Sequence, residues 1–160
     1  MLHSVGHLLF ALGLLRWLTW EYKKPFEPTK HLIWLFLTLF FAILGLLLSE
    51  FSTSGLGIGS FLMHAVGGGM ATACTYEYLR RNLGLKLSWR VELAFFFMFV
   101  SAFGVLNELL EYVAELSGYG IFSLDSQDTW RDFVANSSGA YVVLLGIYIQ
   151  RALPAKDNKK

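Results

Sequence analysis

The stretch HLIWLFLTLFFAILGLLLS, residues 31–49, decides the fold class of this chain. After His31 it holds no ionisable side chain, and its length approaches the roughly 20 apolar residues that a helix needs to cross a bilayer core of about 30 Å. Other stretches of the chain meet the same requirement. The predicted spans are residues 2–20, 31–49, 61–79, 91–115 and 129–150.

The composition of the whole chain also indicates a membrane protein. Hydrophobic residues make up 55% of its 160 residues, and charged residues 16%, against about 25% in soluble domains. So few charges cannot cover the surface of a water-soluble protein of this size. Cys74 is the only cysteine, which excludes a disulfide framework, and a net charge of +1 gives no sign of nucleic-acid binding.

The predicted fold class is therefore all-α, a polytopic transmembrane helix bundle with about five spans. We expect residues 1–153 to form a single transmembrane helical domain and residues 154–160 to form a short basic cytoplasmic tail. The prolines all fall outside the predicted spans, and the tryptophans lie at span ends, as in an interfacial aromatic belt. Both patterns support the span boundaries.

The basic residues predict how the bundle is oriented. Eleven of the 13 Lys and Arg residues lie in alternate loops or in the tail, so they gather on one side of the membrane. By the positive-inside rule this side is the cytoplasm, which places the N-terminus outside and the C-terminus inside. Arg131 alone lies on the opposite side. The expected location is the cell (plasma or inner) membrane, as a multi-pass protein.

In this topology, ionisable side chains of several spans lie toward the outer leaflet. Helix three contributes His64, helix four contributes Glu108 and Glu111, and helix five begins near Asp128 and Asp132. A carboxylate near the bilayer centre costs about 3 kcal/mol on insertion scales if it faces lipid. Glu108 lies seven residues inside its span, so we expect it to face the bundle interior.

Small residues on helix three predict where these groups meet. Gly68 follows His64 one helical turn later, on the same face. We expect Gly68 to let helix three approach helix four or five closely, so that Gly68→Leu would overpack the interface. The predicted contact would bring the acidic residues of those helices to His64.

Crowded carboxylates predict a site that binds a cation or shares protons. Like charges so close together cannot all stay ionised without compensation. We therefore predict a divalent metal ion, the only cofactor expected here. Its predicted ligands are His64, Glu108, Asp128 and Asp132, and the predicted catalytic residues are Glu108, Glu111 and Asp132.

Each group also has a structural interpretation. His3 and His7, at HxxxH spacing, fit an interfacial pair, and Asp125 with Asp128 could cap helix five. The glycines after His64 fit close helix packing. Glu77 and Glu92 are expected to pair with nearby arginines at the inner interface, and they are not part of the predicted site.

Three segments in order carry a family resemblance. They are FLMHAVGGG around His64, NELLEY at 107–112 and DSQDTWRDFVANSSGA at 125–140. This order resembles the VanZ-like and YjdF-like integral membrane proteins of bacteria and archaea. The resemblance implies a membrane bundle and marks His64, Glu108, Glu111, Asp125, Gln127, Asp128 and Asp132. The best-known association of those proteins is low-level resistance to a glycopeptide antibiotic that acts on the envelope.

The sequence leaves three functions open, so whether the chain is an enzyme stays undecided. The first is a metal-dependent hydrolase acting on a membrane lipid or a lipid-linked envelope substrate at the outer leaflet. The second is a noncatalytic envelope-associated binding or resistance protein. The third, a proton- or ion-coupled transporter, is less favoured because no comparable acidic residues continue through the inner half of helices four and five.

Overall fold

The computed structural model describes residues 2–21, 23, 25, 27–49, 58–118 and 126–152, and side chains within these ranges from residue 12 onward except those of 126 and 128. All regular structure in these ranges is helical, which confirms the predicted all-α class. The elements are α1 (Leu2–Glu21), α2 (Leu32–Ser49), α3 (Ile58–Leu62), η2 (Met63–Met70), α4 (Ala71–Asn82), α5 (Trp89–Leu116) and α6 (Ser126–Ala152).

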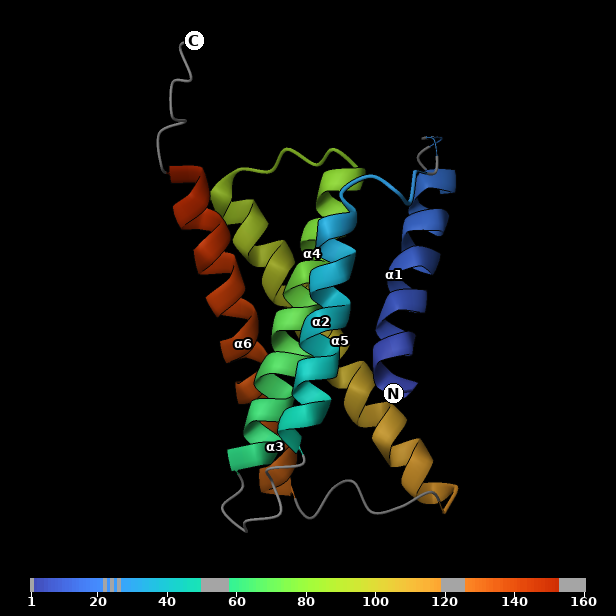
Figure 1. Cartoon of the computed structure of the whole chain (residues 1–160), viewed down its shortest axis with the longest axis vertical. Helices are drawn as coiled ribbons and strands as arrows, with labels where there is room; N and C mark the ends of the chain where they lie inside the picture. The colour runs from blue at the N-terminus through green and yellow to red at the C-terminus, as the bar shows by residue number, and fades with distance from the viewer. Residues whose placement is uncertain are drawn as a thin grey trace.

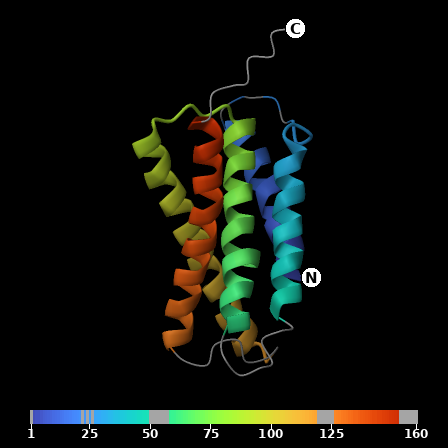
Figure 2. The same ribbon diagram turned by 60° about the vertical axis from the view of Figure 1, so that its left-hand side comes forward.

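The centre of the bundle is a helical rod made of α3, η2 and α4, which follow one another without a break over residues 58–82. The rod lies between α2 on one side and α6 on the other (Figure 2). Helix α6 packs mainly against its η2 segment, whereas α2 packs against both η2 and α4. Figure 1 shows α1 beside α2, and α5 crossing the bundle obliquely. The rod therefore fixes the positions of α2 and α6, and with them the side chains that these helices direct into the bundle.

Among the described residues, three helices are long and apolar enough to cross a membrane: Leu32–Ser49, Trp89–Leu116 and Thr129–Ala152. They present large apolar side chains outward, among them Phe36, Phe97 and Val142. Water would disfavour such a surface, whereas lipid tails solvate it. The other predicted spans, 2–20 and 61–79, coincide with α1 and with the central rod. The predicted tail, 154–160, lies outside the described residues.

The rod departs from the regular α-helix expected over 61–79, because η2 is a π-helix. Glycines bring its backbone into contact with both neighbours. A Cβ on Gly45 of α2 would lie 2.4 Å from Gly67 Cα, and one on Gly139 of α6 would lie 1.7 Å from Ala65 O. The wider turns of a π-helix often occur at functional sites. Apolar periodicity does not reveal this change in winding, so the sequence did not predict it.

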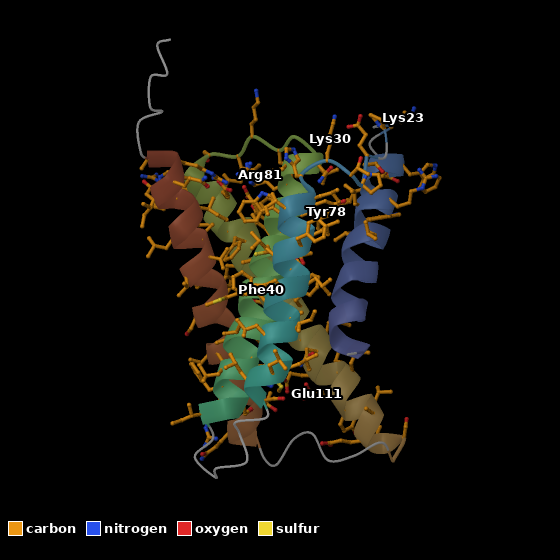
Figure 3. The ribbon with its side chains drawn as sticks, viewed as in Figure 1. Lys23, Lys30, Phe40, Tyr78, Arg81 and Glu111 are labelled. Carbon is orange, nitrogen blue, oxygen red and sulfur yellow. The ribbon has the colours of Figure 1, made fainter. Side chains whose placement is uncertain are left out.

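The charged ends of the bundle differ. Lys23, Lys30 and Arg81 lie at one end, and Glu111 lies toward the opposite end (Figure 3). The end with the lysines and arginines, which we call the basic end, holds residues 27–31, the loop of residues 83–88 and the end of α6. The alternate-loop pattern of the basic residues predicts this arrangement.

Candidate functional site

A buried pair of ionisable side chains joins the central rod to α6. His64 Nε2 lies 3.4 Å from Asp132 Oδ2. The two residues are 7% and 5% exposed. His64 belongs to η2, and Asp132 lies in the second turn of α6. An aspartate that contacts one imidazole nitrogen fixes the orientation of the ring.

The His64–Asp132 pair is one of several contacts between η2 and α6, which run parallel to each other. Gly68, one turn after His64, lies against Asn136, one turn after Asp132. A Cβ on Gly68 would come 1.9 Å from Asn136 Oδ1, and one on Gly69 would come 2.1 Å from Asn136 O. The prediction that Gly68 permits a close approach of the neighbouring helix is confirmed, and the neighbour is α6. The absent glycine side chains leave room for the His64 and Asp132 side chains to meet.

A partly open cavity of about 290 Å³ borders His64 of this pair. Its walls come from α2, η2, α4, α5 and α6, and most of its lining is apolar, including Leu46, Val100 and Phe103. We call it the central cavity. Its polar lining groups are the side chains of His64, Thr72, Asn107, Glu111 and Asn136. An apolar cavity with a few converging polar groups is typical of a small-molecule site.

Helix α5 contributes a hydrogen-bonded pair of side chains to the central cavity. Asn107 Nδ2 donates to Glu111 Oε1 at 2.7 Å, and both residues line the cavity. The two residues are four positions apart, so they share one helical face. Asn136 Oδ1 is buried there and accepts no hydrogen bond from the part of the chain that the structure describes. A polar ligand group could therefore bind to this amide oxygen.

The structure brings some of the predicted site residues together and separates others. His64 contacts Asp132, and His64 and Glu111 line the same cavity. Glu108 lies elsewhere, in a neighbouring cavity of about 270 Å³ between α5 and α6. Glu111 lines this second cavity too, together with Glu115 and Thr129. Glu108 and His64 therefore line different cavities.

Several predicted residues lie outside the described side chains. They are His3, His7, Asp125 and Asp128. Among the described side chains, no group of three or more His, Cys, Asp and Glu residues is arranged to hold a metal ion. His64 and Asp132 are two predicted ligands that contact each other.

Sequence reasoning did not single out two polar residues of the central cavity. Asn107 could have been found from its spacing to Glu111, because an amide and a carboxylate four residues apart meet on a helix. Thr72 gives no such signal. Its side chain reaches the cavity because the rod continues from η2 into α4, and only the packed structure shows this.

A network of arginines and glutamates at the basic end contrasts with this cavity. Glu77 is 1% exposed and accepts hydrogen bonds from Arg80 and Arg81. Arg151 Nη1 donates to both carboxylate oxygens of Glu92, at 3.0 and 2.8 Å, and its Nη2 contacts Glu77 at 3.3 Å. The predicted pairing of Glu77 and Glu92 with arginines is confirmed. These groups hold α4, α5 and α6 together.

The family of the chain follows from a match over residues 1–152 with the model described as "Predicted membrane protein (DUF2238)". The chain belongs to the DUF2238 family. No curated protein and no solved structure matches it. The matched residues of this DUF2238 protein run through every helical element from α1 to α6. Membership thus agrees with the three apolar helices and identifies a membrane protein, without assigning it a reaction.

The central cavity of this DUF2238 protein offers acid–base chemistry beside an apolar surface. An imidazole held by a carboxylate can accept a proton, and a carboxyl group on the same cavity can accept or donate one. The side-chain amides of Asn107 and Asn136 line the cavity and can orient a polar ligand. The apolar walls would accommodate the non-polar part of the same ligand.

Proposed function

We propose that this DUF2238 protein binds the polar end of a membrane lipid or a lipid-linked envelope molecule in the central cavity and hydrolyses it. The observation that carries the proposal is the buried His64–Asp132 pair at the edge of a largely apolar cavity. The apolar walls suit a lipid chain, and the polar groups suit its head. A largely apolar cavity lined by a few polar groups is the usual setting of a catalytic site.

His64 is the proposed general base. One ring nitrogen faces Asp132, and the other accepts a proton from a water molecule as that water attacks an ester carbonyl or a phosphoryl group. Asp132 orients the ring and stabilises the imidazolium that forms. Glu111, held by Asn107, donates a proton to the leaving oxygen. Glu108 borders the neighbouring cavity, so this mechanism gives it no proton transfer.

A divalent cation remains a separate proposal for the same site. His64 and Asp132 supply an imidazole nitrogen and a carboxylate, a donor set that suits zinc or manganese. Asp128, one turn before Asp132 on α6, would add a second carboxylate. Metal content would be measured in purified protein after reloading, for the wild type, His64→Ala and Asp132→Asn, with Glu108→Gln as a comparison from the neighbouring cavity. Unchanged binding in His64→Ala and Asp132→Asn would contradict this ligand set.

Turnover is the direct test of the hydrolase. Protein in lipid nanodiscs would be incubated with phosphatidylglycerol, phosphatidylethanolamine or a polyprenyl diphosphate, with and without a chelator, and products followed by mass spectrometry. We expect His64→Gln to reduce hydrolysis about 100-fold or more, since general bases contribute on that order. His31→Gln is the matched control, because His31 is exposed in the loop before α2. Equal rates for both variants would contradict the assignment of His64.

Noncatalytic binding in the same cavity is the second candidate. The observation that favours it is the role of His64, Asp132 and Asn136 in joining the rod to α6. The VanZ-like and YjdF-like resemblance of the three sequence segments supports an envelope-associated role for either candidate. Lipid bound by the wild type and lost in His64→Gln, with no product formed, would favour this second function.

The outer-leaflet position of the site is part of the proposal, as is a multi-pass topology in the plasma membrane. Single cysteines would be placed at Ser54 and Asn158 in a Cys74→Ala background. An impermeant thiol reagent should label them from opposite sides, with Ser54 labelled from outside. Labelling of both from one side would contradict the proposed topology and the outer location.

A further inference from the structure

A groove between α5 and α6 at the basic end shares no lining residue with the central cavity. We call it the lateral groove. Its volume is about 470 Å³. The apolar and aromatic lining consists of Trp89, Leu93, Tyr141, Leu144, Leu145 and Tyr148, and its polar lining consists of Glu92 and Arg151. The groove is therefore apolar along most of its length and charged at one end.

The charged end carries more cations than anions. Arg80, Arg81 and Arg151 surround Glu77 and Glu92, which leaves one positive charge in excess. Arg90 adds a second, since it is exposed beside Trp89 and forms no ion pair within the described part of the chain. Such a surplus favours an anion at the mouth of the groove.

Arg151 retains capacity for a further acceptor. Its Nη1 and Nη2 donate to Glu92 and Glu77, whereas its Nε donates to no oxygen among the residues that the structure describes. The Arg151 side chain is 35% exposed, so a ligand can reach it. A guanidinium presents five donors and binds phosphate oxygens well.

The apolar length of the groove corresponds to one leaflet of a bilayer. Along α6 its lining runs from Tyr141 to Arg151, which is about 15 Å at 1.5 Å per residue. Half of a hydrocarbon core of about 30 Å has the same depth. Trp89 and Tyr148 are exposed near the charged end, where aromatic side chains mark the level of lipid headgroups.

We propose that the lateral groove is a binding site for an anionic phospholipid. Its phosphate lies at Arg151 and Arg90, and an acyl chain lies along α6 toward Tyr141. Basic pockets between membrane helices bind anionic headgroups for this reason. The proposal does not depend on the function of the central cavity. It places a lipid at the site where the arginine network joins α5 to α6.

Native mass spectrometry of the detergent-purified full chain tests this proposal. The wild type would be incubated with phosphatidylglycerol and phosphatidylcholine of the same acyl chains, so that only the headgroup charge differs. We expect a preference for phosphatidylglycerol of about fivefold or more. Equal binding of the two lipids would overturn the proposal.

Two pairs of variants locate the bound lipid. Leu145→Trp fills the groove and should weaken phosphatidylglycerol binding about tenfold by overpacking it, whereas Val142→Trp, at an equally exposed position (59%) outside the groove, should leave binding unchanged. Arg90→Gln should weaken it about fivefold, and Lys23→Gln, at the same end on another loop, should not. All four substitutions are at exposed positions, and thermal unfolding would verify the fold. Equal losses within each pair would overturn the assigned location.

Discussion

The two ends of the bundle hold their buried ionisable groups in different ways. At the basic end, Glu77 and Glu92 are bonded by arginines in charge-assisted pairs. At the opposite end, Asp132 contacts an imidazole, and His64 borders a cavity. Guanidinium groups stay charged at every relevant pH, so the basic end keeps a fixed charge pattern. The imidazole of His64 instead borders the central cavity, where a ligand could contact it.

This difference separates a structural cluster from a candidate site. A fixed network of opposite charges binds helices together and offers no proton to a ligand. The His64–Asp132 pair lies beside a cavity, and its proposed role is to exchange protons with a ligand bound there. Three substitutions test whether the two ends differ in this way.

Glu77→Gln tests the arginine network. Glu77 is bonded by Arg80 and Arg81 and contacts Arg151, so its loss leaves cations with too few anionic partners. Removing one partner of a buried ion pair costs about 3 to 5 kcal/mol of unfolding free energy. Thermal unfolding in detergent would measure the change. The control Glu27→Gln breaks the exposed Glu27–Lys30 pair and should cost no more than about 1 kcal/mol.

A wild-type melting temperature for Glu77→Gln would contradict the structural role of the basic end. The buried Glu77 would then not stabilise the fold, and the two ends would no longer differ in this respect.

Gly139→Ala tests the contact that holds the cavity end together. The added Cβ would overlap the carbonyl oxygen of Ala65, a backbone atom that moves only with η2. We expect a loss of about 1 to 3 kcal/mol, typical of overpacking. Gly146→Ala on the same helix is the matched control, since no atom lies within 4 Å of its added Cβ. The control should be neutral, or more stable by up to about 1 kcal/mol through higher helix propensity.

If Gly139→Ala and Gly146→Ala unfold at the same temperature, α6 does not contact η2 as closely as described. The register that brings His64 to Asp132 would then be wrong as well.

Asp132→Asn should have the smallest effect on stability. The amide keeps the shape and can still bond to His64, so the expected loss is about 1 kcal/mol, the net value of one hydrogen bond. Thermal unfolding would be compared with that of Glu21→Gln, an exposed carboxylate at the end of α1. A loss as large as that of Glu77→Gln would show that the two ends are both structural, and it would weaken the proposed catalytic role of Asp132.

Sequence reasoning found the helices and part of the site for identifiable reasons. Apolar runs as long as residues 31–49 have few alternatives to a membrane span, and α2 covers nearly the same residues. The spacing of His64 to Gly68 predicts that they share one helical face, and this face meets α6. The depth of Glu108 and the helical face that it shares with Glu111 predict that it lies near His64. Neither pattern gives the rotation of α5 against its neighbours, and Glu108 borders another cavity.

The sequence by itself determined the class of the molecule, since the free energy of transferring apolar or charged side chains into lipid depends on residue type and on length of run. It also determined that the basic residues gather at one end, because alternate loops of a helical bundle must do so. Tertiary structure decided the π-helical winding of η2, the partners of its glycines and the positions of Thr72 and Asn107 around the central cavity. These features depend on the distance, rotation and register between helices. Those quantities are set by mutual packing of side chains far apart in the chain, and no local pattern encodes them.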